Sequence, residues 1–229
     1  MTLRELFQNM VKMFVEYYIR GGLLWSGIGY TLLLAAIAVA VGAVLGSLLA
    51  IGKRSRFGPL KFLIAAFVEV IRGTPALVQL YLAYFVVPML LNTPSLSPFT
   101  CVAVALSLNS AAYVSEIIRS GIQAVDIGQT EAARALGLTG KTAMLKIVLP
   151  QAVKNILPAL GNEFITVIKE TSLASTFYVG ELMTTYYTVR SVTYNALPIL
   201  MDISIVYFVV NYGLSKLMGA FERRMKAGA

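Results

Sequence analysis

Polar and ionisable side chains stand inside long apolar stretches of this sequence, where each one needs a specific reason to be present. Asn109, Tyr113 and Glu116 are separated by four and three residues, a spacing that places them on one face of a helix. Glu163 and Glu170, seven residues apart, share a face in the same way. Two such faces predict a polar path between two helices, with carboxylates that attract a cationic group. The structural alternative is that these glutamates only hold helices together.

A helix break is predicted at Gly73-Thr74-Pro75, because proline lacks a backbone donor and glycine is a poor helix former. A helix that restarts after a break presents free backbone N–H groups, and broken helices in membrane carriers bind anionic groups in this way. Thr74 lies in the break and is a candidate ligand-binding residue. Glu69 and Arg72, three residues apart, are spaced to form an ion pair just before it.

The chain is too apolar for a soluble protein. It has 229 residues, of which 58% are hydrophobic and 13% charged, whereas a soluble domain carries about a quarter charged residues. Residues 32–52 and 75–114 contain no charged side chain, and each stretch is at least as long as the roughly 20 residues that span a hydrocarbon core. These features predict an all-α integral membrane protein. No connecting stretch is long enough for a separate core, so residues 1–229 are expected to form a single transmembrane domain.

Several function classes are excluded by composition. The net charge of +8 does not mark a nucleic-acid-binding protein, because the basic residues lie in short loops between apolar segments. With Cys101 as the single cysteine and no histidine, an intrachain disulfide and a zinc site are ruled out. The segment Gly137–Thr142 imitates a phosphate-binding loop, but two residues separate its glycines where that loop needs four. No nucleophile is paired with a base, so the chain is expected to be no enzyme and to bind no nucleotide.

Five apolar segments are predicted to cross the membrane, and an amphipathic segment over residues 1–20 precedes them. Within it, residues 3–18 predict a helix that lies on the membrane surface or packs on the bundle. Its apolar face consists of Leu3, Phe7, Met10, Phe14 and Tyr18. The predicted spans are residues 23–51, 58–90, 99–120, 156–179 and 197–220.

The first span carries small residues at every fourth position, which predicts a seam on which another helix packs closely. The seam consists of Ala38, Gly42, Gly46 and Ala50.

Basic residues gather in two of the connecting segments and at the C-terminus. Residues 53–61 and the long segment 121–155 are rich in lysine and arginine and are therefore placed on the cytoplasmic side. Residues 91–98 carry no charge and residues 181–196 carry one basic side chain, Arg190, so both are placed outside. This pattern predicts an external N-terminus and a cytoplasmic C-terminus.

The cytoplasmic segment contains a spaced motif: a Glu-Ala-Ala triplet, three residues, glycine, nine residues, isoleucine, any residue, and Leu-Pro. It resembles the EAA loop of the permease subunits of ABC importers at every fixed position. The matching residues are Glu131, Ala132, Ala133, Gly137, Ile147, Leu149 and Pro150.

In that family the loop forms a short helix that docks into a groove of the ATPase subunit, and the residue types suit this role. Glu131 is expected near a helix N-terminus, where the helix dipole favours negative charge. Ala132 and Ala133 leave a small surface for close docking. Gly137 is expected to end the helix, and Pro150 to restart the chain toward the fourth span.

Further stretches resemble the polar amino-acid permeases of this family, and the resemblance covers roughly residue 27 to the C-terminus. It implies the type I importer fold and a substrate pocket between helices, formed by Asn109, Tyr113, Glu116 and Glu163, together with Thr74. The carboxylates would attract the ammonium of an amino acid, and the helix break would receive its carboxylate. The stretches that carry the resemblance are residues 69–80, 109–121, 161–164 and 169–173.

The resemblance also implies partners and a location. The assembly would contain two permease subunits, either two copies or two paralogues, and two ATPase subunits that bind ATP and Mg. A separate extracytoplasmic binding protein would deliver the amino acid. The chain itself would bind no cofactor and would lie in the lipid bilayer of the bacterial cytoplasmic membrane.

Two alternatives are weighed against this reading. A secondary amino-acid carrier would need its own ion pathway and usually has internal repeats, and no repeat is evident in the sequence. An ABC importer permease for a solute other than an amino acid would share the EAA loop. Which amino acid is carried, and what the N-terminal segment does, are not indicated by the sequence.

Overall fold

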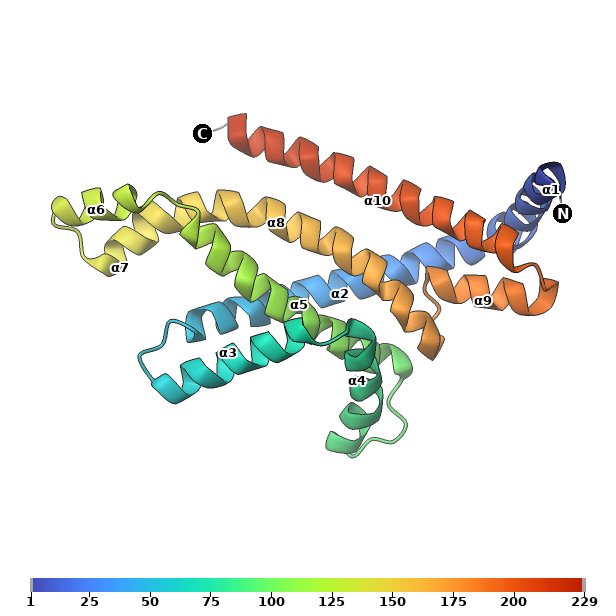
Figure 1. The fold of residues 1–229 in the computed structure, drawn as a ribbon, viewed down its shortest axis with the longest axis horizontal. Coiled ribbons are helices and arrows are strands. Elements are labelled where there is room, and N and C mark those ends of the chain that lie inside the picture. The colour runs from blue at the N-terminus through green and yellow to red at the C-terminus, as the bar shows by residue number, and fades with distance from the viewer. Residues whose placement is uncertain (1, 228–229) are drawn as a thin grey trace.

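The computed structural model describes residues 2–227, and throughout this range the regular structure is helical. The predicted domain covers residues 1–229, of which residues 1, 228 and 229 lie outside the described part. Figure 1 shows the long helices extended along the longest axis of the molecule. They are α2 (Leu23–Gly52), α5 (Pro98–Gln123), α8 (Leu149–Glu170) and α10 (Ala196–Ala227).

Four helical stretches are long and apolar enough to cross a membrane, and a fifth span results if the bent pair α3–α4 is counted as one. The predicted first, third and fifth spans correspond to α2, α5 and α10. The all-α membrane fold predicted from composition is therefore confirmed. The amino end of α2 and the carboxyl end of α10 lie toward opposite ends of the long axis (Figure 1), and α6 and α7 lie on the same side of the molecule as the carboxyl end of α10.

The predicted seam of small residues packs α2 against α5. A side chain added at Gly46 would place its Cβ 2.7 Å from the Ala111 carbonyl oxygen, and one at Gly42 would meet Ser110 at the same distance. Ala38 is fully buried in the same core. Ala50, the last residue of the seam, instead lines a groove between α2, α5 and the segment formed by η2 (Met144–Val148) and α8.

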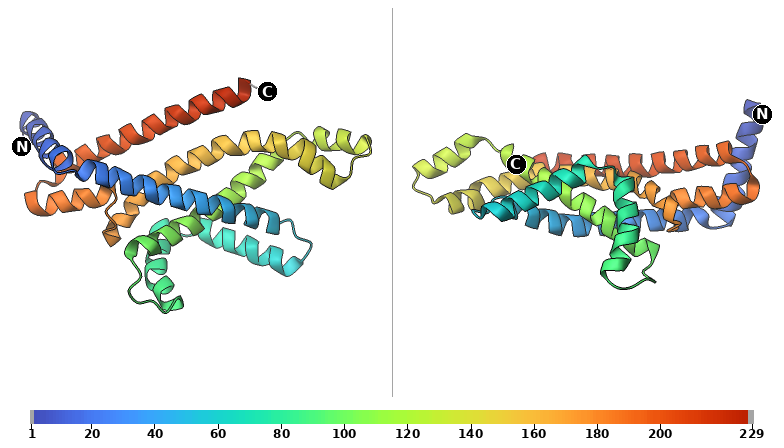
Figure 2. Two further views of the ribbon diagram at one scale, coloured as in Figure 1. Left: turned by 180° about the vertical axis from the view of Figure 1, so that it is seen from behind. Right: turned by 60° about the horizontal axis from the view of Figure 1, so that its bottom comes forward.

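The predicted break in the second span is a sharp bend. Helix α3 (Gly58–Gly73) ends at Thr74, whose backbone is extended, and α4 (Ala76–Leu90) begins after Pro75. The two helices are bent by 114°, so α4 stands across the long helices instead of continuing α3 (Figure 2). The predicted interruption within residues 58–90 is therefore present, and the structure adds that the two helices meet at a corner.

The fourth span begins earlier than the sequence predicts. Helical turns run without interruption from Gly140 to Phe177, through α7 (Gly140–Ala143), a π-helical turn η2 (Met144–Val148), α8, and a 3-10 turn η3 (Thr171–Phe177). Pro150 lies inside this run, at the second residue of α8 and directly after the π-helical turn η2. The segment over residues 121–155, predicted to be cytoplasmic, therefore contains α6 (Ile127–Ala135), α7, η2 and the first turns of α8.

The connecting segment over residues 181–196, for which the sequence predicts an external position and no helix, contains a helix, α9 (Leu182–Thr193). Glu181 is fully buried and caps α9: its carboxylate accepts hydrogen bonds from the Met183 and Thr184 backbone N–H groups at 2.6 and 2.7 Å. Tyr207 of α10 donates to the same carboxylate at 3.2 Å. Burial raises the pKa of Glu181, while the hydrogen bond from Thr184 lowers it. The cap gives this polar, tyrosine-rich segment a helical start that its hydropathy does not reveal.

The N-terminal segment forms α1 (Leu3–Met13), which begins with a capping box between Thr2 and Glu5, and a π-helical turn η1 (Phe14–Arg20). Met13 and Tyr18 are buried in a core shared with α9 and α10, whereas Leu3 remains 85% exposed. Of the two predicted arrangements, the structure shows packing on the bundle, with the first turn of the helix extending away from it (Figure 1).

Replacing Gly46 with leucine is expected to separate α2 from α5, because the new side chain would collide with backbone and Val114. Overpacking of this kind destabilises a protein by about 1–3 kcal/mol, which a thermal unfolding curve of the detergent-purified protein would show as a lower Tm. Gly29→Leu is the matched control in α2, since a Cβ there meets nothing within 4 Å. Equal Tm values for the two variants would contradict the packing described for the seam.

Candidate functional site

The Gln79 side chain joins the bend between α3 and α4 to α5. Its Nε2 donates to the Ile71 carbonyl oxygen at 2.7 Å and to Thr74 Oγ1 at 2.9 Å, and Thr74 Oγ1 donates to the Val70 carbonyl at 2.8 Å. Its Oε1 accepts from Asn109 Nδ2 of α5 at 2.9 Å. Two predicted site residues, Thr74 and Asn109, are thus connected through a residue to which the sequence analysis gave no role.

Asn109 contributes a free acceptor at this point. The residue is only 4% exposed, and its Oδ1 is buried with no hydrogen-bond partner within the described part of the chain. A buried polar atom without a partner is uncommon and calls for an explanation. The orientation of the amide follows from Gln79, because Nδ2 must face the Gln79 carbonyl oxygen. The free Oδ1 is therefore held in a fixed, buried position as an unused hydrogen-bond acceptor.

The first turn of α4 offers donors beside this acceptor. Pro75 is its N-cap residue and no side chain caps the helix. Val78 and Gln79 donate to the Pro75 carbonyl, which leaves the N–H groups of Ala76 and Leu77 as the unpaired donors that a helix start normally presents. The helix dipole makes this end of α4 attractive for an anion. The donors predicted at the break are thus present in the structure.

Tyr113 and Glu116 lie further along the same face of α5, inside a cluster of basic residues. Lys53 Nζ lies 2.6 Å from Glu116 Oε1, and Arg119 Nη2 lies 2.7 Å from Glu116 Oε2. Arg72 of α3 approaches the same carboxylate at 3.8 Å and stacks over the Tyr113 ring, with 5.5 Å from the guanidinium carbon to the ring centre.

The ion pair suggested between Glu69 and Arg72 is replaced by this arrangement. Arg72 extends toward α5, where it meets both Glu116 and Tyr113, while Glu69 is exposed on α3. The negative charge of Glu116 is neutralised by three cations. Attraction of a ligand ammonium by Glu116 would therefore require these cations to move away.

Glu163 occupies a different place. It is 9% exposed on α8 and faces the Ser110 hydroxyl of α5, with Glu170 within electrostatic reach. Ser110 and Asn109 are neighbours in sequence and point about 100° apart around α5. The structure therefore places Glu163 at the α5–α8 contact, whereas Thr74, Asn109, Tyr113 and Glu116 lie toward α3 and α4.

The residues of the EAA-like motif form a compact module at one end of the molecule. Gly137 has a φ of +82°, and it follows the last turn of α6. Leu138 N–H donates to the Ala133 carbonyl and Gly137 N–H to the Arg134 carbonyl. These two bonds form a Schellman motif, which requires a left-handed residue at the glycine position. The predicted role of Gly137 in ending the helix is confirmed.

The start of α6 differs from the prediction. Asp126 is its N-cap and accepts a hydrogen bond from Gly128 N–H at 2.6 Å, so Glu131 lies past the first turn instead of near the N-terminus. Glu131 and Ala132 are exposed, while Ala133 is 4% exposed. The helix α6 therefore packs against its neighbours through Ala133, while the Glu131 side chain is exposed on the surface of the described chain.

The second half of the motif folds back onto the first. α6 packs on η2, and Gln151 of α8 donates to Gln129 of α6 at 3.3 Å. Ile147 in η2 and Leu149 at the start of α8 are half-buried, and Pro150 is exposed. The motif thus unites a short surface helix with the end of a helix that crosses the membrane.

Two parts of the site were not identified from the sequence. Gln79 is a single amide in an apolar stretch; its only signal was its position, four residues after Pro75, beside the predicted break. Lys53 was assigned only to a basic loop, although it contacts Glu116, which lies 63 residues later. Within residues 2–227, no group of three or more His, Cys, Asp or Glu side chains could hold a metal ion.

A helical membrane bundle with a polar cluster at a broken helix, and with an exposed helical module at one end, has the layout of a membrane-embedded transport subunit. Residues 42–227 match the family of binding-protein-dependent transport system inner membrane components. The chain belongs to this family.

Curated relatives extend over nearly the whole chain. The arginine transport system permease protein ArtQ of Bacillus subtilis is 41% identical over 202 residues, which cover 88% of this chain and 92% of ArtQ. The L-cystine transport system permease protein TcyB of the same organism is 36% identical, with 89% of this chain and 86% of TcyB covered. The glutamine transport system permease protein GlnP of Escherichia coli K12 is 35% identical, with 89% and 93% covered.

Solved structures agree with this assignment. An amino acid ABC transporter crystallised with histidines matches with a TM-score of 0.87 and 44% identity, and the match covers 92% of this chain and 98% of the other. The inward-facing MetNI methionine ABC transporter matches with a TM-score of 0.73 and 20% identity over 90% and 97% of the two chains. The second likeness concerns the fold alone.

Replacing Gln79 with leucine is expected to weaken the corner between α3 and α4, because the Ile71 carbonyl and the Asn109 amide lose their partner. An unsatisfied buried group costs about 1–3 kcal/mol, so the Tm of the purified protein should fall. Gln8→Leu on the exposed face of α1 is the control and should leave the Tm unchanged. A Gln79→Leu protein as stable as the wild type would show that the three hydrogen bonds do not hold the corner.

Proposed function

We propose that the chain is the membrane subunit of an ATP-driven amino-acid importer and forms the path through which the amino acid crosses the membrane. The observation that carries the proposal is the buried polar site at the α3–α4 bend, where Asn109 Oδ1 has no partner and the start of α4 offers free donors. Relatives named for arginine, L-cystine and glutamine transport support an amino acid as the solute.

An amino acid carries a carboxylate and an ammonium, and this site offers backbone donors for the first and an acceptor for the second. Its carboxylate would bind the N–H groups at the start of α4, where the helix dipole favours an anion. Its ammonium would bind Asn109 Oδ1 once a movement of the surrounding helices uncovers that atom, with Tyr113 and Thr74 beside it. Glu163, which faces Ser110 at the α5–α8 contact, would join the site only after α8 shifts relative to α5. Glu163 lies on α8, so a shift of α8 relative to α5 would change its distance from the other residues. Glu116 would join the site only after Lys53 or Arg119 releases it.

The exposed module α6–η2 would be the contact with a separate ATPase subunit, which binds ATP and Mg, while this chain binds neither. Glu131 and Ala132 are exposed on α6, and the Schellman motif at Gly137 holds the helix end in place. A second permease subunit, either a copy or a paralogue, and an extracytoplasmic binding protein would complete the assembly. The basic residues of 53–61 and of the α6 region support a cytoplasmic position for this end of the molecule, and the N-terminus would then lie outside.

The first test concerns the coupling module. Gly137→Val should prevent stable association with the ATPase subunit, because a β-branched residue at a φ of +82° is strained by about 1–3 kcal/mol. Association is measured by co-purification of the ATPase with the tagged permease from membranes. Gly140→Val is the matched control, since its Cβ approaches only the flexible end of Arg134. Normal recovery of the ATPase with Gly137→Val would contradict the proposed contact.

The second test concerns the pocket. Glu163→Gln keeps the shape of the side chain and removes its charge, and the loss of a charge-assisted hydrogen bond should reduce uptake by roughly tenfold or more. Uptake of radiolabelled amino acids is measured in liposomes that contain both subunits, with ATP inside and binding protein outside. Glu69→Gln, an exposed glutamate on α3, is the control with the same change of charge.

Two results would overturn these assignments. Wild-type uptake by Glu163→Gln would remove Glu163 from the pocket. Uptake in liposomes that lack the ATPase, driven by an ion gradient, would show a secondary carrier in place of an ATP-driven importer.

A further inference from the structure

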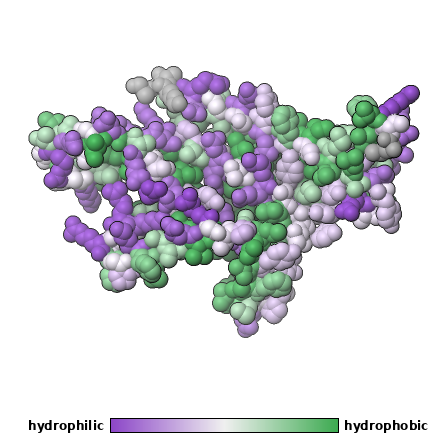
Figure 3. Space-filling view, in the orientation of Figure 1, coloured by the Kyte–Doolittle hydropathy of each residue, from purple (hydrophilic) through white to green (hydrophobic). Residues whose placement is uncertain are grey.

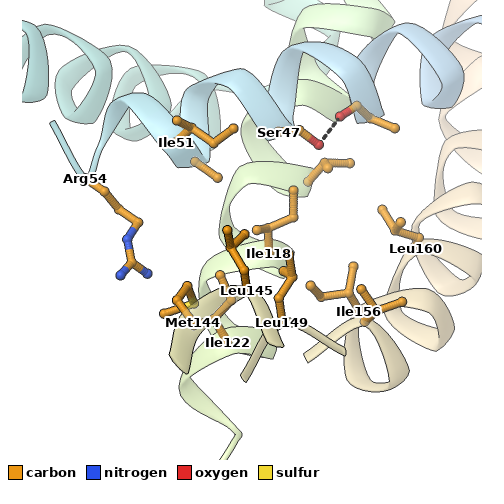
Figure 4. A pocket seen from close by; sticks show the side chains of 14 residues that line it. Ser47, Ile51, Arg54, Ile118, Ile122, Met144, Leu145, Leu149, Ile156 and Leu160 are labelled. Atoms are coloured by element: carbon orange, nitrogen blue, oxygen red, sulfur yellow. Dashed lines mark hydrogen bonds between the residues drawn. The ribbon is translucent and has the colours of Figure 1, made fainter. Parts of the chain in front are cut away.

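An elongated groove lies between α2, α5 and the η2–α8 segment, on the side of α5 that does not carry Tyr113 and Glu116. It has a volume of about 430 Å³, and its walls are apolar: Ile51, Ile118, Leu145, Leu149 and Ile156 are among them. Figure 4 shows these side chains directed into a common space, with Arg54 at one end. We call this space the α2–α8 groove.

A second hollow of about 220 Å³ continues the groove at its Arg54 end. Both are lined by Ala50, Arg54, Ile118 and Ile122, which makes them one continuous depression. Lys53 and Arg119 line only the second hollow. An apolar channel therefore opens into a mouth that is surrounded by three basic side chains, Lys53, Arg54 and Arg119.

The mouth carries an excess of positive charge. Lys53 and Arg119 share the Glu116 carboxylate with Arg72, and Arg54 has no ion-pair partner within the described part of the chain. Neither the groove nor the hollow has an acidic side chain among the described residues that line it. Three cations share one carboxylate in this region and Arg54 adds a fourth positive charge, so an additional anion would be stabilised there.

The position of the mouth suits a lipid headgroup. Helix α2 ends at Gly52 and α5 at Gln123, so the basic residues stand where two membrane helices end. From there the groove follows α2 back to Ala43, about 12 Å along the helix axis from Ile51. Basic pockets between membrane helices bind the headgroups of anionic lipids, and here an apolar wall continues from the headgroup position into the bilayer.

We infer that the α2–α8 groove binds an anionic phospholipid, with its phosphate against Arg54 and the neighbouring basic residues and an acyl chain along Ala50, Ile118 and Leu149. A free phosphate would use only the mouth and would leave the apolar wall uncovered. Leu149 belongs to the EAA-like motif and lines the groove, so the bound lipid would contact the same helix turn that receives the movement of α6.

The test is a lipid titration followed by native mass spectrometry of the purified transporter. Phosphatidylglycerol should bind more tightly than phosphatidylcholine, and Arg54→Gln should weaken phosphatidylglycerol binding about fivefold, as expected for one basic residue at an anionic surface. Arg56→Gln removes an equal charge from the same loop, outside the groove lining, and should bind phosphatidylglycerol like the wild type. Glycerol phosphate should not displace the lipid, because it lacks the acyl chain.

A second pair of variants tests the apolar wall alone. Ala50→Phe fills the groove and should abolish preferential binding although every basic residue remains, whereas Leu48→Phe, at a 61% exposed position of α2, should not. Equal binding of the two lipids, or wild-type binding by both Arg54→Gln and Ala50→Phe, would overturn the inference. So would disulfide formation between two Val153→Cys subunits, since it would show a second copy in the groove.

Discussion

The hydrogen bonds of Gln79 are the interaction on which the polar site depends. A helix that breaks inside a membrane leaves carbonyl groups that water cannot reach, and such groups must find partners within the protein. Gln79 provides the partner for the Ile71 carbonyl and for Thr74. Its remaining oxygen orients Asn109. The Gln79 amide therefore satisfies backbone and side-chain groups that the bend between α3 and α4 would otherwise leave without partners. It also fixes the orientation of the Asn109 Oδ1 acceptor.

The basic cluster around Glu116 joins regions that lie far apart in the sequence. Lys53 follows α2, Arg72 ends α3, and Glu116 and Arg119 belong to α5. Three helices therefore meet at one carboxylate. The same cluster limits what Glu116 can do for a substrate, since a neutralised carboxylate attracts a second ammonium only weakly. It also gives the groove on the far side of α5 its basic mouth.

Local patterns predicted much of the fold, and long-range pairing explains most of what they missed. The faces of α5, the seam of Gly42 and Gly46, and the helix end at Gly137 follow from spacing and residue type within a few positions of each other. The contact between Lys53 and Glu116 could not be predicted in this way, because the two residues lie 63 positions apart in the sequence.

Helix α9 was missed because its start depends on the buried carboxylate of Glu181 and on Tyr207, which donates a hydrogen bond to it from α10. The place of Glu163 beside Ser110 required knowledge of how α8 packs on α5. The pocket roles of Asn109, Tyr113, Glu116, Glu163 and Thr74 stay predictions.

The uninterrupted helical run from Gly140 to Phe177 has a mechanical consequence. Its 38 residues would measure roughly 57 Å if all of them were α-helical. The run begins beside α6 and carries Glu163 in its second half, so a tilt of the whole run would move both the end that packs on α6 and the end that carries Glu163. At that length, a tilt of only about 5° about one end displaces the other end by roughly 5 Å. A small displacement of α6 that tilts the run would therefore move the far end of the run by a larger distance. That distance is of the size needed to open or close a site for a small molecule.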